Sequence, residues 1–223
     1  MEHAMSENVP NDSDSETNPP SPHPGQPPLI EPDEQEIAAK LAAIAHSNPW
    51  MSPDSIARDT RRIMQMNANI GSKRQRLIEL ADRVNAAVQP HVACRTGCSY
   101  CCSMPTMIFQ HEAERLAEAS GRPAVPVRFK SHDHALLAAL RFYGQACPFL
   151  NEGRCTVYAA RPIICRLHHS LNASPANCDC SIPPAERMGV AQYDPDYVET
   201  PYRLLSIRAN PGEPWGAIQE FFP

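Results

Sequence analysis

The stretch that decides the fold reads CRTGCSYCC from Cys94 to Cys102 and places four cysteines within nine residues. Gly97 lies inside this stretch and lets the backbone turn sharply, so that the loop can fold its thiols toward one point. One metal ion gathers its sulfur ligands at about 2.3 Å, which is why ligands close in sequence are typical of metal sites. The spacing therefore predicts a metal-binding loop. Its candidate ligands are Cys94, Cys98, Cys101 and Cys102.

A second block reads CPFLNEGRCTVYAARPIICR over residues 147–166 and contains three more cysteines. A cysteine followed by proline, as at Cys147, also occurs at iron–sulfur ligands. Pro162 is expected to start a short helix, with Cys165 in its first turn. The positive end of that helix, flanked by Arg161 and Arg166, is expected to lower the pKa of the Cys165 thiol. The block adds three candidate ligands, Cys147, Cys155 and Cys165.

Together the two blocks resemble the zinc- or iron-chelating cysteine-cluster family, known as CxxCxxCC or YkgJ-type. Its pattern is a cysteine block ending in Cys-Cys, then Cys-Pro-x-Leu, then Cys-x2-Tyr-x2-Arg-Pro-x2-Cys-Arg. The resemblance covers about residues 90–170 and departs in having three residues between Cys94 and Cys98 instead of two. It implies metal chelation and no firm reaction, although one branch is linked to lysine methylation of flagellin. The matching positions are Cys94, Cys98, Cys101, Cys102, Cys147, Pro148, Leu150, Cys155, Tyr158, Arg161, Pro162, Cys165 and Arg166.

Sulfur ligands suit both zinc and iron, so the sequence leaves open a zinc ion, an iron ion or a [4Fe–4S] cluster. Seven cysteines exceed the four that one such centre uses. Cys101 and Cys102 are adjacent and tend to point apart, so one of them supports the other or two metals are bound. Cys178 and Cys180 lie outside the family pattern and are either spare ligands or ordinary loop thiols, of which the second interpretation is favoured. The candidate acid–base groups nearby are Tyr158, His168 and His169. Each histidine is also a candidate metal ligand, and a hydrogen-bonding role near the cluster is favoured over ligation.

Two other interpretations of the cysteines fit less well. Disulfide pairing conflicts with the odd count of nine, with the adjacent Cys101 and Cys102 and with the absence of an export signal. The segment from Cys94 through Cys98 to Cys101 also matches the radical S-adenosylmethionine signature. That chemistry sits on a βα barrel of about 200 residues or more, whereas 122 residues follow Cys101 without alternating strands and helices.

The remaining chain predicts a mainly α fold, with a helical N-terminal arm and a small irregular cysteine-rich metal-binding core. Residues 1–32 are Pro-rich and lack aromatic residues, so they are expected to form a disordered tail. Residues 33–90 form the helical arm and residues 91–180 the metal-binding domain. Residues 181–223 form a Pro-rich C-terminal wrap with at most one helix, near residues 202–208.

Capping signals place the helices of the arm. One helix is expected over 33–45, and a second helical region is expected to start at Pro53, with Ser52 as its cap, and to run to Val88 with a break near Gly71. Downstream, the helix over 132–143 is expected to turn Leu136, Leu137 and Leu140 inward. Other short elements are expected: a strand over 105–109, a helix over 110–119 that ends at Gly121, and a hairpin that turns at 151–153.

A heptad row of apolar residues runs through residues 53–88, at Ile56, Ile63, Ile70, Leu77 and Val84. It indicates either packing onto the chain's own core or a homodimer through this helical region. Arginines and lysines in the same region lack interleaved aromatic residues, which argues against nucleic acid as a partner. The net charge of −5 argues likewise.

No targeting segment and no apolar run of membrane length is visible, so the expected location is the cytoplasm, where thiols stay reduced. Three functions remain open. The leading one is a metal-binding protein that holds zinc or an iron–sulfur cluster. The second is an iron–sulfur enzyme of redox or methyl-transfer type, like the flagellin lysine methylase branch. The third is a helical interaction protein whose small core is stapled by metal.

Overall fold

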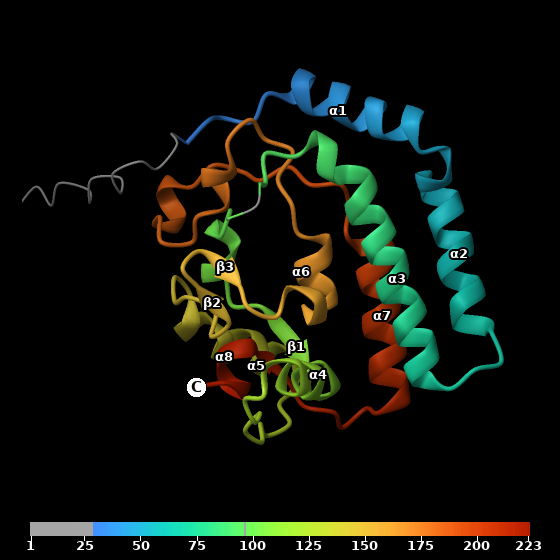
Figure 1. Cartoon of the computed structure of the whole chain (residues 1–223), viewed down its shortest axis with the longest axis vertical. Helices are drawn as coiled ribbons and strands as arrows, with labels where there is room; N and C mark the ends of the chain where they lie inside the picture. The colour runs from blue at the N-terminus through green and yellow to red at the C-terminus, as the bar shows by residue number, and fades with distance from the viewer. Residues whose placement is uncertain (1–28, 96) are drawn as a thin grey trace, which may run out of the picture.

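The computed structural model of the chain describes residues 29–95 and 97–223, so most of the tail expected over 1–32 lies outside the described part. The described part is mainly helical, as the sequence predicts. A layer of long helices lies on one side, and the cysteine-rich segment forms an irregular region of short elements on the other (Figure 1). Within the described residues, no helix is both long enough and apolar enough to cross a membrane.

The N-terminal arm consists of α1 (Glu34–Ser47), α2 (Pro53–Gln65) and α3 (Ile70–Val88). Its capping signals act as expected, since Asp33 accepts hydrogen bonds at the start of α1 and Ser52 does so at the start of α2. The helical region is interrupted near Gly71, as expected, and the break lies at residues 66–69, directly before α3. The physical reason is Asn69, whose side chain accepts from the backbone nitrogen of Ser72 at 2.8 Å and starts the helix there.

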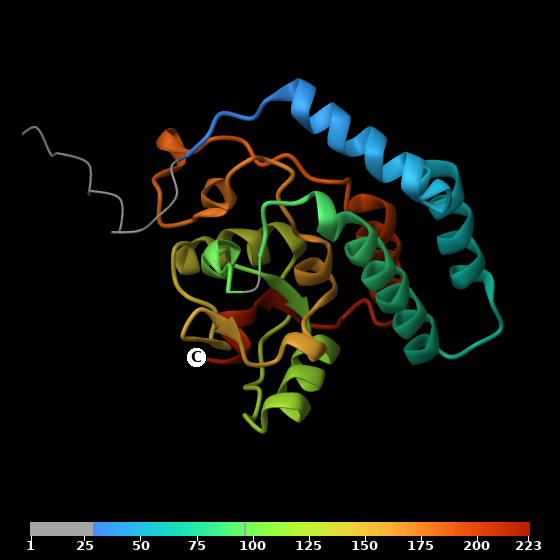
Figure 2. The same ribbon diagram turned by 45° about the horizontal axis from the view of Figure 1, so that its top comes forward.

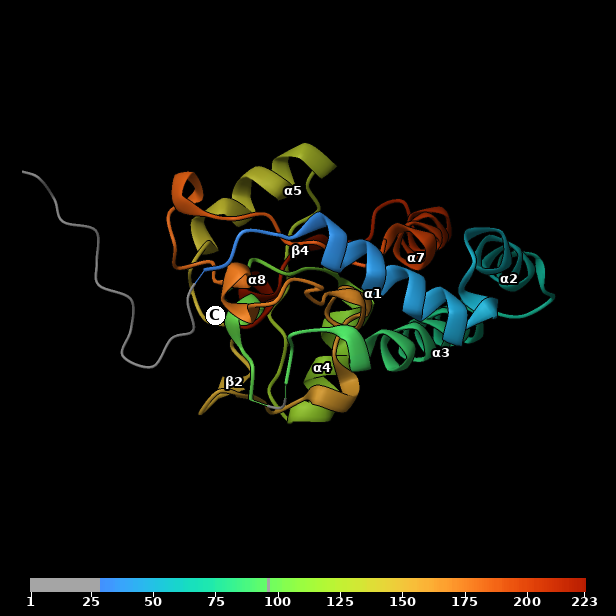
Figure 3. The same ribbon diagram turned by 90° about the horizontal axis from the view of Figure 1, so that it is seen from above.

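The core between the helices uses the apolar heptad row. Helix α7 (Asp196–Ala209) packs against α2 and α3, and the short α6 (Ile163–Leu167) packs against α3. Ile56, Leu77 and Val84 are buried in this core together with Tyr202 of α7. Figures 2 and 3 show α1 lying across one end of the layer. The row therefore packs inside the chain, and a homodimer through 53–88 finds no support in it.

The C-terminal segment contains more regular structure than the sequence predicts. Helix α7 begins at Asp196, before the expected 202–208. Strand β4 (Trp215–Ala217) pairs antiparallel with β1 (Met107–Phe109), the strand expected after the first cysteine block. Helix α8 (Ile218–Phe221) then enters a second apolar core. The pairing of residues so far apart in sequence gives no local signal, which explains why it was not predicted.

Helix α4 (Gln110–Ser120) ends at Gly121 in the left-handed conformation, φ +71°, as expected. A helix is present at α5 (His132–Ala139), but the expectation that its leucines turn inward is wrong. Leu136 and Leu137 of α5 are 43% and 64% exposed, and Leu140, directly after it, is 60% exposed. The face that α5 turns toward β4 carries Ala135 and Ala139, both buried. Small residues occupy that face because the helix packs closely on the backbone of the strand.

Candidate metal centre

The first cysteine loop is a compact turn between α3 and the 3-10 helix η3 (Tyr100–Ser103). Gly97 has φ +88°, as expected for a glycine at which this loop turns sharply. The Cys98 nitrogen donates to the carbonyl of Arg95, and the Cys102 nitrogen to that of Ser99, both at 2.9 Å. These two backbone bonds form tight turns that begin at Arg95 and Ser99.

Within this loop the thiols form two hydrogen-bonded pairs. Cys94 is paired with Cys98, and Cys101 with Cys102. In the first pair, the hydrogen bond from Cys94 lowers the pKa of Cys98 to about 6, and the same contact raises the pKa of Cys94. In the second pair, the pKa of Cys102 is lowered and that of Cys101 is raised. One sulfur of each pair is therefore favoured as thiolate, the form that ligates metal.

The second cysteine block lies directly against the first. The backbone nitrogen of Cys147 donates to the carbonyl of Cys102 at 2.7 Å, and Gly144 donates to Ser103 at 3.0 Å. Two stretches that are far apart in sequence therefore meet at Cys102. Cysteines of both blocks can share a metal only if the two stretches lie together, and this contact places them together.

A hairpin fixes the positions of Cys147 and Cys155, as the sequence predicts. Strands β2 (Leu150–Asn151) and β3 (Arg154–Cys155) pair with Leu150 opposite Cys155, and the turn between them contains Gly153 with φ +73°. Backbone N–H groups two residues downstream donate to both sulfurs and favour their thiolates. Burial outweighs these bonds and raises the pKa of Cys147 to about 11.

The fourth sulfur near this junction belongs to Cys165, on α6. Two side chains hold the helix: Arg166 bonds to Asp82 of α3, and Glu112 accepts from the Ile163 nitrogen at 3.2 Å. The expected lowering of the Cys165 pKa is wrong. Burial raises this pKa, and the charges of neighbouring cysteines and of Glu112 raise it further. The positive groups do not compensate, because α6 has only five residues and Arg166 is engaged with Asp82.

Cys102, Cys147, Cys155 and Cys165 interact electrostatically, and the interactions extend to the first loop, because Cys165 also acts on Cys101 and Cys98 also acts on Cys102. The pKa values of Cys147, Cys155 and Cys165 are raised first by burial and then by the negative charge of neighbouring cysteines. Four thiolates that repel one another are stabilised by a cation placed among them. A set of four sulfur donors also suits zinc or iron. The chemistry of these residues therefore fits the metal that the sequence predicts.

The thiols would need to adjust before they could ligate. Within residues 29–95 and 97–223, no three His, Cys, Asp or Glu side chains are arranged to hold a metal ion. Rotation about the Cα–Cβ bond of cysteine moves the sulfur between staggered positions without moving the backbone. The backbone positions of the two cysteine blocks, which meet at Cys102, therefore matter more for a metal site than the present rotation of each thiol.

The placement of Cys178 was not predicted from the sequence. This residue ends the 3-10 helix η6 (Pro175–Cys178), which packs against η3 of the first loop. Its thiol is buried and bonded to the side chain of Ser170, whose backbone also bonds to Cys94. No local sequence motif marks Cys178 as part of the cysteine region. Its link to the first loop is Ser170, which bonds to both Cys94 and Cys178 and carries no recognisable motif itself.

The candidate acid–base groups have other partners. His169 accepts from the backbone nitrogen of Tyr193 at 3.1 Å, and burial lowers its pKa to about 4. His168 contacts Gln192 at 3.4 Å, and burial lowers its pKa too. These bonds agree with the predicted hydrogen-bonding role. Tyr158 is 59% exposed and lies under the guanidinium of Arg161.

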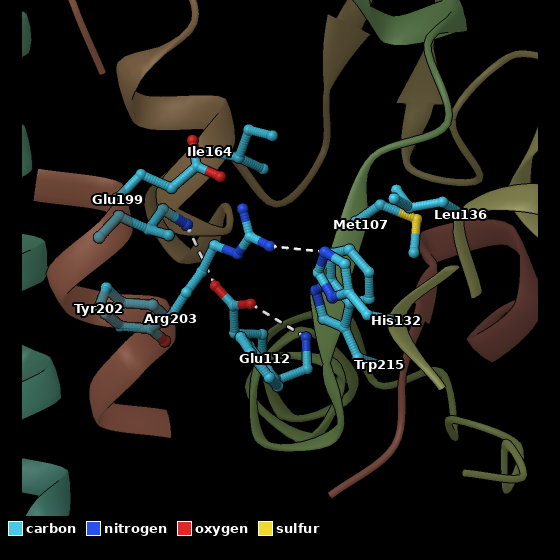
Figure 4. Close-up of a pocket in the computed structure, with 11 residues that line it drawn as sticks. Met107, Glu112, His132, Leu136, Ile164, Glu199, Tyr202, Arg203 and Trp215 are labelled. Atoms are coloured by element: carbon cyan, nitrogen blue, oxygen red, sulfur yellow. Dashed lines mark hydrogen bonds between the residues drawn. The ribbon is translucent and has the colours of Figure 1, made fainter. Parts of the chain in front are cut away.

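A cavity of about 200 Å³ lies against α6, and no cysteine is among the residues that line it. Ile163 and Ile164, which directly precede Cys165, form part of its wall. Figure 4 shows Arg203 reaching into the cavity between Glu199 and His132. Arg203 donates to the Nε2 of His132 at 2.8 Å, and burial raises the pKa of Glu199. The cavity therefore combines apolar walls with both signs of charge.

One comparison with known proteins gives a match. Residues 93–182 match the family model CxxCxxCC, described as "Putative zinc- or iron-chelating domain". The matched segment contains all nine cysteines of the chain. Neither the curated proteins nor the solved structures include a match to this chain.

Proposed function

Because residues 93–182 form a domain of the CxxCxxCC family, we propose that this protein holds zinc or an iron–sulfur cluster through cysteine thiolates. The proposed ligands are the seven cysteines of the family pattern. One observation carries the proposal: the 2.7 Å hydrogen bond from the Cys147 nitrogen to the Cys102 carbonyl, which joins the two blocks. The seven ligands are Cys94, Cys98, Cys101, Cys102, Cys147, Cys155 and Cys165.

Electrostatics supports the same proposal. The buried cysteines around Cys165 raise one another's pKa values, so in the absence of a cation they favour the protonated form. A bound cation reverses this preference, and binding should release protons. All nine cysteines are free thiols. Free thiols fit a reducing compartment, and we propose the cytoplasm on that ground.

The direct experiment is metal analysis of the full chain purified without oxygen. We expect stoichiometric metal, either zinc in a colourless protein or iron with sulfide in a brown one. Cys165→Ser should lose metal, because it removes the buried sulfur on α6. Ser103→Ala is the matched control, since it alters a residue beside the cluster without removing a sulfur. A wild-type protein without zinc or iron after reconstitution would refute the proposal.

The cavity beside α6 favours a second candidate, an iron–sulfur enzyme of redox or group-transfer type. A substrate held by Arg203 or Glu199 would lie against the residues that precede Cys165. Dithionite reduction of the anaerobic protein tests this candidate. Bleaching of a brown chromophore supports it, and a colourless zinc protein excludes it.

The division into an arm over 33–90, a metal-binding domain over 91–180 and a wrap over 181–223 remains a prediction.

A further inference from the structure

The cavity against α6 is built partly from segments that lie outside the matched domain. Its wall includes Glu199 and Arg203 of α7 and Trp215 of β4, all of which follow residue 182, where the family match ends. On the α5 side the wall reaches solvent, since His132 is exposed and Leu136 is 43% exposed. The cavity is therefore accessible to a ligand, and the cysteine segment alone does not form it.

An acidic and a basic side chain face this cavity without pairing. Glu199 lies four positions before Arg203 on α7, which is the spacing and order at which a carboxylate and a cation normally pair on a helix. Among the residues that the structure describes, Arg203 nevertheless forms no ion pair with Glu199 or with any other carboxylate. Its guanidinium donates to His132 at 2.8 Å and lies 5.3 Å from the ring centroid of Trp215. Figure 4 shows the guanidinium held in this way between Glu199 and His132.

The other titratable side chains of the wall already have partners. Both oxygens of Glu112 accept from backbone nitrogens, one from Phe109 at 3.1 Å and the other from Ile163 at 3.2 Å. The hydroxyl of Tyr202 is bonded to the ring of His111 at 2.7 Å. The Nε2 atom of His132 accepts from Arg203. A ligand would therefore find its charged contacts at Glu199 and Arg203.

The rest of the wall and its volume limit the kind of ligand. The volume of about 200 Å³ equals roughly seven water molecules at their volume in the liquid. It is smaller than the sites of about 300–1,000 Å³ that hold drug-sized molecules and cofactors. The ligand is therefore small, and much of it contacts hydrocarbon. The apolar side chains in the wall are Met107, Phe109, Leu136, Ile163 and Ile164.

We propose that this cavity binds a free α-amino acid with a small apolar side chain, whose carboxylate pairs with Arg203 and whose ammonium group pairs with Glu199. A ligand with one charge would leave either the carboxylate or the guanidinium without a counter-ion, whereas a zwitterion satisfies both. Binding itself does not involve the metal. A role for the amino acid as a substrate rests on the second candidate function, the iron–sulfur enzyme.

Isothermal titration calorimetry of the full chain with chemical analogues tests the proposal on the wild type. The probes are leucine, isocaproate, which lacks the amino group, and isopentylamine, which lacks the carboxylate. Leucine should bind at least about tenfold more tightly than either analogue, because each charged end forms a hydrogen bond to a charged group. Equal affinity for leucine and one analogue would overturn the proposal. The absence of saturable binding by leucine, valine and methionine would overturn it too.

Variants then assign the two ends of the ligand. Arg203→Gln should abolish the difference in affinity between leucine and isopentylamine, and Glu199→Gln the difference between leucine and isocaproate. Arg208→Gln is the matched control, because Arg208 is an exposed arginine of α7 outside the cavity wall, and it should bind leucine like the wild type. A difference that persists in both cavity variants would contradict the assignment of the ends.

Tryptophan fluorescence locates the bound ligand without altering its charged contacts. The chain has two tryptophans, and Trp215 lies in the cavity wall, with its ring stacked on that of His132 at 4.2 Å between centroids. In Trp50→Phe, Trp215 is the sole reporter, and leucine should change its emission with the same midpoint as the calorimetric titration. Calorimetric binding without this change would place the ligand elsewhere and overturn the proposal.

The metal content of each sample separates this inference from the proposed metal function. Leucine binding by a chain that takes up no zinc or iron would refute the metal function and leave the amino-acid site standing. A metal-loaded protein that does not bind these amino acids would refute the amino-acid site and leave the metal function standing.

Discussion

Replacing Arg166 by alanine should destabilise the protein strongly, because this buried guanidinium holds the cysteine-bearing α6 to two other segments. Its side chain is 6% exposed. It donates to the carbonyls of Ala159 at 2.6 Å and Arg161 at 2.9 Å, and to both carboxylate oxygens of Asp82. The substitution removes all of these donors at once.

The expected cost follows from the burial of each partner. A hydrogen bond to a charged group contributes about 1.5–3 kcal/mol, so the two bonds to carbonyls account for about 3 kcal/mol or more. The ion pair adds less, because the Asp82 side chain is 45% exposed and can be hydrated again. Asp82→Asn should therefore cost about 1 kcal/mol or less. Arg166→Lys should fall between the two, because it keeps the charge and loses the planar fork.

Urea unfolding of the metal-loaded protein measures these differences. With a slope of about 2 kcal/mol/M, the Arg166→Ala midpoint should fall by about 1.5 M, and the Asp82→Asn midpoint by about 0.5 M or less. Metal content should fall in parallel for Arg166→Ala, since the position of Cys165 depends on α6. Equal midpoints for Arg166→Ala and Asp82→Asn would refute the view that the carbonyl bonds dominate.

Two further predictions concern groups outside the cysteine region. Burial alone would raise the pKa of Glu213, but hydrogen bonds from the side chain and backbone of His111 lower it overall, so the stability it contributes is present at neutral pH and is lost as pH falls below about 5. Thermal melts should show Glu213→Gln to be less acid-sensitive than the wild type in that range, and parallel pH profiles would contradict this. Leu137→Gln should change the free energy of unfolding by less than about 0.5 kcal/mol, whereas Ala135→Leu should cost about 1–3 kcal/mol, because only Ala135 is buried against β4. Equal effects on the urea midpoint would show that α5 is oriented differently.

Features with a local physical cause were predictable from sequence. Asp33 and Ser52 cap helices because their side-chain oxygens accept from nearby N–H groups, and Gly121 ends α4 because it tolerates positive φ. The cysteine loop and the hairpin at Gly153 belong to the same class. In each case the residues that interact are only a few positions apart.

Features that depend on distant partners were not predictable in this way. The buried face of α5 is decided by β4, which β1 holds in place, so Leu137 could not be distinguished from Ala135 by pattern alone. Burial of Cys165 overrides the helix and arginine signals that suggested a lowered pKa. The position of Cys178 depends on Ser170, which carries no recognisable motif.

X-ray absorption at the metal edge of the anaerobically loaded protein tests the central claim most directly. If cysteine thiolates hold the ion, its nearest shell consists of about four sulfurs at about 2.3 Å for zinc, and sulfur dominates for iron as well. A shell made mainly of nitrogen and oxygen at about 2.0–2.1 Å would contradict the claim, whatever the amount of metal bound.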